Sequence, residues 1–138
     1  CDVAYGAGVV YAAVGTVDGR LILFGESDSG GWRAVSSLWI APDSGPCSVE
    51  FIRRTPLGFV VGGSASCGLT FYGHCMETLC DRLPLTREDG SLADVVDAAY
   101  IESGDGGALL LVTSDGGLLG VAEPCKRFED EYLVAVSV

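Results

Sequence analysis

The chain has 138 residues, 49% of them hydrophobic, and 20 are glycine. Its 19 acidic residues outnumber 8 basic ones, which gives a formal net charge of −11 at pH 7. Because a surface of that sign repels phosphate backbones, we expect no nucleic-acid partner. No apolar run approaches the roughly 18 residues that a membrane-spanning helix needs, so we expect no membrane partner either.

The first predicted elements are two strands at residues 9–14 and 20–24, separated by Asp18-Gly19. An Asp-Gly pair favours a tight hairpin turn, because glycine adopts the positive φ that such turns require. Residues 32–40 follow a polar, glycine-rich stretch and carry two tryptophans. This segment is predicted to be an outer strand beside the hairpin.

The same arrangement returns in the middle of the chain. Apolar runs at residues 59–63 and 69–72 flank Cys67-Gly68 and predict a second hairpin. Residues 74–96 are the least strand-like part of the chain, and a helical turn is one interpretation of residues 74–80. Residues 86–90 are polar and are predicted to be a loop.

A third hairpin is predicted from residues 108–113 and 117–121, which flank Asp115-Gly116. Residues 132–138 predict one further strand. The strands of the three hairpins are apolar almost throughout rather than alternating with polar residues. That pattern is typical of strands covered on both faces.

The three turn glycines are 49 and 48 residues apart, and a short apolar-aromatic segment precedes each hairpin, at residues 3–5, 49–51 and 98–100. A period of 40 to 50 residues is typical of propeller blades built from four strands. We therefore predict an all-β fold, a partial β-propeller of about three blades, with repeats at approximately 2–47, 48–95 and 96–138. The alternative is a small β-sandwich or barrel, in which the repeat is accidental.

Two segments carry a resemblance to a known family. The residues Val3-Ala4-Tyr5 and Val14-Gly15-Thr16-Val17-Asp18-Gly19-Arg20-Leu21-Ile22-Leu23-Phe24 resemble the inner strands of WD40-type blades. The second copy, Gly58-Phe59-Val60-Val61-Gly62-Gly63-Ser64 with Leu69-Thr70-Phe71-Tyr72, resembles divergent blades of large ciliary and flagellar WD-repeat scaffolds. The chain lacks the Gly-His and Trp-Asp dipeptides of the family, so its hydrogen-bonded tetrad is not expected here.

The candidate metal ligands are Cys67, His74, Cys75 and Cys80, which surround the only histidine of the chain. Cysteine and histidine are the ligand types that zinc prefers. No Cys-x-x-Cys spacing accompanies them, so we expect uncoordinated side chains and no cofactor, with a disulfide in this group as the alternative. For the six cysteines as a whole we expect reduced thiols.

A catalytic role finds little support in the sequence. Residues 102–110 resemble the Gly-Asp-Ser-Gly-Gly turn of trypsin-like proteases, but the nucleophilic serine is missing between Asp105 and Gly106. The 138 residues also fall short of the two barrels that such a protease uses. An inactive relative of that family is the third interpretation of the chain.

The predicted function is therefore a non-catalytic scaffold that binds other proteins, with other subunits or missing blades of the same protein as partners. Candidate interaction residues are Trp32, Trp39, Arg53 and Arg54. The resemblance implies a cytoplasmic location, including the cytoskeleton and the cilium. The alternative is a secreted or viral β-domain, stapled by disulfides, that binds a ligand or host factor.

Overall fold

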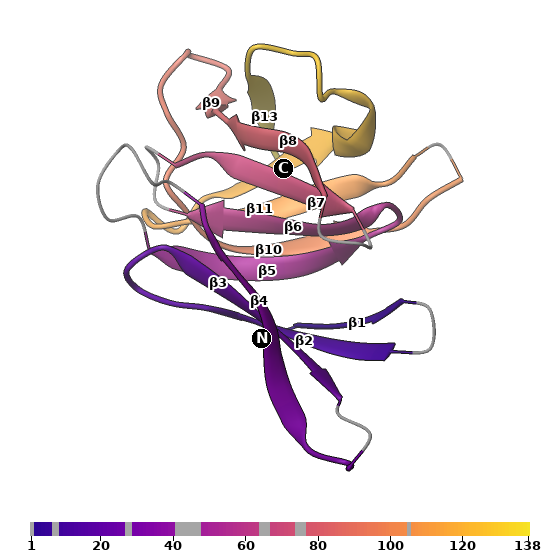
Figure 1. Ribbon diagram of the computed structural model, residues 1–138. Helices are drawn as coiled ribbons and strands as arrows, with labels where there is room; N and C mark the ends of the chain where they lie inside the picture. Colours follow the sequence, from indigo (N-terminus) through magenta and orange to yellow (C-terminus); the bar gives the residue numbers. More distant parts are fainter. Residues whose placement is uncertain are drawn as a thin grey trace.

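The computed structural model describes residues 2–6, 9–26, 29–40, 48–63, 67–73, 77–104 and 106–138, with the backbone alone for the strand residues up to 11. The fold is all-β, as predicted from the sequence. Its strands form three sheets, none of which closes into a barrel within the described ranges. The arrangement is consistent with a partial β-propeller or with a sandwich (Figure 1).

Each sheet is built mainly from neighbouring antiparallel strands. The first sheet has the order β1 (Asp2–Gly6), β2 (Val9–Gly15), β3 (Arg20–Glu26), β4 (Trp32–Trp39). The second has the order β5 (Val49–Thr55), β6 (Gly58–Gly63), β7 (Leu69–Gly73), β8 (Thr78–Leu83). The third has the order β10 (Val95–Ile101), β11 (Ala108–Thr113), β12 (Leu118–Ala122), β13 (Leu133–Ser137), β9 (Leu85–Arg87). A short 3₁₀ helix, η1 (Pro124–Lys126), follows β12.

The three predicted hairpin turns are confirmed at the expected residues. Gly19, Gly68 and Gly116 have φ values of 85°, 62° and 83°, in the left-handed region that glycine adopts without strain. The first and third turns also share their hydrogen bonds. In each, a threonine hydroxyl (Thr16 or Thr113) donates to the aspartate two residues later and lies 3.0 or 3.1 Å from the carbonyl oxygen four residues later. The repeat in the sequence is therefore accompanied by the same hydrogen bonds at these two turns.

The second sheet lies between the other two, and its inner strands are buried throughout. Val61, Phe59 and Tyr72 on one of its faces pack with Leu21 and Leu23 of the first sheet. On its opposite face, a second apolar cluster joins it to the third sheet; its largest members are Phe51, Val60, Leu69, Phe71, Leu109, Leu111, Leu119 and Leu133. Every residue of β6 and β7 is buried, because both faces of these strands are covered.

Neighbouring sheets approach each other through their first strands. β5 contacts both β1 and β2 of the first sheet and β10 of the third sheet. Gly15 allows this approach, because a Cβ added there would lie 2.1 Å from Cγ1 of Val49. In Figure 1 the first sheet, in indigo and purple, lies below the strands of the other two. First strands that lie side by side in succession are typical of propeller blades.

Two expectations need correction. The helical turn is wrong for residues 78–80, since β8 begins at Thr78. The loop predicted at 86–90 begins within β9, which pairs in parallel with β13, so this strand of the second sequence repeat belongs to the third sheet. Threonine, a β-branched residue, favours the extended conformation in both segments.

Candidate interaction surface

The outer face of the third sheet is apolar and exposed. The register aligns Leu110 with Gly120 and Gly120 with Val136, so alternate residues of β11, β12 and β13 point away from the second sheet. We call this surface the C-terminal apolar face; it consists of Ile101, Leu110, Val112, Leu118, Val134, Val136 and Val138. Val136 is 48% exposed and Val138 75% exposed, although both are aliphatic.

The inner face of the same sheet is covered by the second sheet, unlike the outer face. Leu109, Leu111 and Leu119, one residue away along the strands, are at most 2% exposed because the second sheet covers them. Leu133 likewise has no exposed surface. Within the third sheet, the uncovered apolar surface is thus on the outer face.

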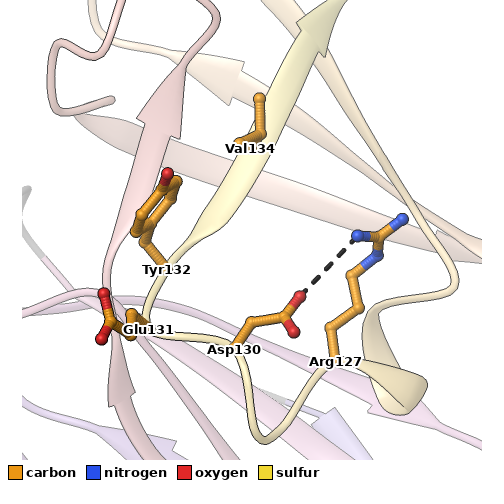
Figure 2. A pocket seen from close by; sticks show the side chains of 5 residues that line it. All are labelled: Arg127, Asp130, Glu131, Tyr132 and Val134. Carbon is orange, nitrogen blue, oxygen red and sulfur yellow. Dashed lines mark ion pairs between the residues drawn. The ribbon is translucent and has the colours of Figure 1, made fainter.

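An open hollow of about 310 Å³ adjoins the C-terminal apolar face where β12 and β13 separate. It is lined by Arg127, Asp130, Glu131, Tyr132 and Val134 (Figure 2). β13 pairs with β12 only near its end, at Val136 and Ser137, whereas its first half pairs with β9. The two strands therefore leave a gap at Val134.

Arg127 closes the inner end of this hollow. Its Nε donates a hydrogen bond of 3.0 Å to the carbonyl oxygen of Ala122, the last residue of β12, which pairs with β11 but has no partner in β13. Its Nη1 lies 3.7 Å from a carboxylate oxygen of Asp130, the ion pair drawn in Figure 2. The hollow thus gives the apolar face a charged margin, and an apolar centre with a polar rim is the usual composition of a protein interface.

The first sheet has an uncovered face as well. Its outward residues, here called the N-terminal outer face, are Val14, Ile22, Phe24, Trp32 and Trp39. Trp39 is 50% exposed, and the guanidinium carbon of Arg20 lies 4.7 Å from the centre of its ring. Both candidate tryptophans therefore lie on a surface that no other described element covers.

The candidate arginines have different surroundings. Arg53 is engaged within the fold, because its guanidinium forms an ion pair with Asp97 and donates from Nε to the carbonyl oxygen of Ala98, 2.5 Å away. Arg54, the next residue of β5, is exposed. Arg53 thus holds the second and third sheets together, and only Arg54 is placed to meet a partner.

The structure places two of the four candidate metal ligands. Cys67 is bonded in a disulfide and is buried in the β6–β7 turn, which contradicts the expectation of a reduced thiol at this position. A disulfide sulfur offers no thiolate to a metal. His74 and Cys75 lie outside the described residues. Within the described ranges, no group of three or more histidine, cysteine or acidic side chains could hold a metal ion.

Cys80 and Cys125 carry free thiols. Cys80 lies 3.5 Å from the carbonyl oxygen of Phe128, and burial raises its pKa, to which the charge of Asp81 adds. Burial also raises the pKa of Cys125. Both thiols are therefore protonated at neutral pH, a state unsuited to nucleophilic chemistry.

Sequence reasoning missed the C-terminal apolar face as a surface, although it identified the strands that form it. The signal was the even-numbered valines of residues 134–138, which alternate with Leu133 and Ala135. Among the residues that the structure describes, no helix has the length and apolar character to cross a membrane. A comparison with models of protein families, with curated proteins and with solved structures finds no match to this chain.

Proposed function

We propose that this chain is a non-catalytic interaction module of β-propeller type, which binds another protein through the C-terminal apolar face. One observation carries the proposal. The second sheet covers one face of the first, and the third sheet covers the far face of the second, whereas no described element covers the far face of the third. Contiguous exposed apolar surface of this kind marks protein interaction sites in soluble proteins.

The chemistry of the face defines the partner. The centre of this face carries aliphatic side chains and no charge. It therefore favours a flat apolar partner surface, such as the face of another β-sheet. Other subunits and further blades of the same protein both offer such a sheet. Blade stacking would also shield the edge of β13 beyond Ala135, where β9 no longer pairs with it.

The disulfide at Cys67 favours a second candidate, the secreted domain that binds a ligand or host factor. Disulfides persist in oxidising compartments and are rare in the cytosol. This observation bears on where the protein works rather than on which face it uses. The docking proposal applies equally to a cytoplasmic scaffold and to a secreted domain.

Site-specific photo-crosslinking in cells that make the protein tests the proposal. A photoreactive phenylalanine analogue at position 136 should give discrete adducts with protein, because Val136 lies near the centre of the face. The matched control is position 57, since Leu57 is exposed to a similar degree on the β5–β6 turn. Absence of adducts at 136, or equal labelling at both positions, would contradict the proposed function.

A further inference from the structure

We infer that the partner of the C-terminal apolar face is a protein that places an arginine or lysine side chain in the hollow beside Val134. The inference rests on the proposed function and adds the chemistry of the partner. The apolar contact lies on β11, β12 and β13, and the basic side chain of the partner lies at the end of the face where β12 and β13 separate.

Negative charge is concentrated in the part of the chain that forms the third sheet. Residues 84–138 contain 11 of the 19 acidic residues but only 3 of the 8 basic ones. Residues 1–83 contain the other 8 acidic residues and 5 basic ones, so the first two sheets are nearly balanced in charge. Because charge of one sign attracts partners of the other sign and repels those of its own, the third sheet favours a basic protein.

The basic residues of this segment are already engaged. Each of the three forms an ion pair with a carboxylate of the same segment; the pairs are Arg87–Asp115, Lys126–Glu123 and Arg127–Asp130. At the turn end of the face, Asp97 pairs with Arg53 of the second sheet. Glu131 differs, because it is exposed and, among the residues that the structure describes, no cation pairs with it. Uncompensated negative charge therefore lies at the hollow.

The walls of the hollow suit a long basic side chain. Val134 and the ring of Tyr132 offer apolar contacts, and these side chains are 44% and 49% exposed. Figure 2 shows Glu131 beside Tyr132, on the side of the hollow away from Arg127. Arginine and lysine pack their aliphatic stems on apolar surface while the charged end meets a polar group, and a cation over an aromatic ring adds attraction. One side chain of the partner can thus contact Val134, Tyr132 and Glu131.

Arg127 does not take this place itself. Its Nε donates to the carbonyl oxygen of Ala122, 3.0 Å away, and its Nη1 lies 3.7 Å from a carboxylate oxygen of Asp130. These contacts hold the guanidinium at the inner end of the hollow, and the charges of Arg127 and Asp130 offset each other. Glu131 therefore leaves the lining residues with a net negative charge, which an arriving cation meets.

The response to salt separates a basic partner from other occupants. Screening shortens the reach of exposed charges from about 10 Å at 0.1 M salt to about 3 Å at 1 M, so salt should weaken the attraction between Glu131 and a cation of the partner. Salt does not weaken a purely apolar contact in this way. Two copies of this chain, each with a net charge of −11, would instead associate more tightly as salt screens their repulsion.

The test is photo-crosslinking from position 136 in an extract of cells that make the protein, at about 50 and about 500 mM salt. The yield of adducts with the partner should fall as salt rises. Glu131→Lys should lower the yield at least about fivefold, because repulsion between like charges replaces attraction. The matched control is Glu26→Lys, which makes the same charge change at an exposed position of the first sheet and should leave the yield unchanged.

Equal yields from the unmodified chain and Glu131→Lys overturn the inference, as does a yield that rises with salt or an adduct between two copies. In each of these cases adducts still form at position 136, so the proposed function survives. If the unmodified chain gives no adducts at position 136, the proposed function fails and the inference fails with it. If Glu131→Lys does not fold by circular dichroism, Glu131→Gln replaces it, with Glu26→Gln as its control and a decrease of about twofold expected.

Discussion

The Nε atom of Arg53 on β5 lies 2.5 Å from the carbonyl oxygen of Ala98 on β10, and this hydrogen bond joins the first strands of two successive sheets. The same guanidinium donates to the carbonyl oxygen of Ile52, 2.7 Å away, and pairs with Asp97. A planar fork with several donors suits this bridging position, because one side chain reaches three acceptors at once. The stacking of the second and third sheets thus has a polar link beside its apolar core.

We expect Arg53→Ala to lower the free energy of unfolding by about 1–2 kcal/mol, because the carbonyl oxygen of Ala98 loses its donor while the ion pair with Asp97, partly exposed, contributes little. The matched control is Arg54→Ala at the exposed neighbouring position, for which we expect almost no change. Urea titrations followed by tryptophan fluorescence measure both. Equal effects of the two substitutions would show that Arg53 has no bridging role.

Tyr72 should make the fold sensitive to high pH. Burial beside Phe59, and the charge of Asp81, raise the pKa of Tyr72 from 10 to about 12. Because this pKa is raised in the folded state, the unfolded chain ionises first as pH rises above 10. Stability is then lost progressively up to the folded pKa, by at most about 3 kcal/mol.

The measurement is the free energy of unfolding in urea from about pH 9 to about pH 12. In Tyr72→Phe the ring can still stack on Phe59, but the ionisable group is gone, so this variant should lose less stability over that range. If the free energy of unfolding falls equally steeply with pH in both proteins, groups other than Tyr72 cause the loss of stability at high pH.

The Thr113 turn should contribute to stability through its hydroxyl. Thr113 is buried and donates to Asp115, and this hydrogen bond is the main reason why the pKa of Asp115 is lowered. Thr113→Val should therefore cost about 1 kcal/mol of stability at neutral pH. Ser114→Ala, at an exposed position of the same turn, should cost much less.

The sign of the pH dependence follows from the lowered pKa of Asp115. Its contribution to stability is complete above the ordinary aspartate value and disappears as pH falls through the folded value. The difference between wild type and Thr113→Val should accordingly shrink in acid. If the difference in free energy of unfolding between the two proteins stays constant down to about pH 2, the contribution of the Thr113 hydroxyl does not depend on the charge of Asp115.

Reduction should destabilise the protein through Cys67. Its disulfide constrains the unfolded chain, and such a bond typically contributes about 2–4 kcal/mol. Thermal unfolding with and without a thiol-free reductant measures the effect. Cys80→Ala removes a free thiol and provides the control, because it should leave the response to reductant unchanged. A melting temperature that does not respond to reductant would refute a structural role for the bond.

The turns and the inner strands could be predicted from sequence because their signals are local. Asp18-Gly19 and Asp115-Gly116 each specify a turn within four residues, and the runs beside them are apolar enough to be strands. The alternation of Leu133 with Val134 was also present in the sequence. Which face of β13 packs against the core depends on how the sheets stack, and no local sequence pattern predicts it.

β9 could not be predicted for the same reason. Leu85, Thr86 and Arg87 form a strand because they pair with Leu133, Val134 and Ala135, almost 50 residues later in the chain. Parallel pairing over that distance leaves no turn signal between the partners. The bridging role of Arg53 likewise requires Asp97 and Ala98 from the next sheet, whereas the sequence displays only an adjacent pair of arginines.

The central claim, that another protein covers the C-terminal apolar face when the protein works, is tested most directly by a photoreactive residue at position 136 in cells that make the protein. The account predicts discrete protein adducts at position 136 and far fewer at position 57, because Leu57 is exposed to a similar degree but lies off this face. No adducts at position 136, or equal labelling at the two positions, would contradict the account.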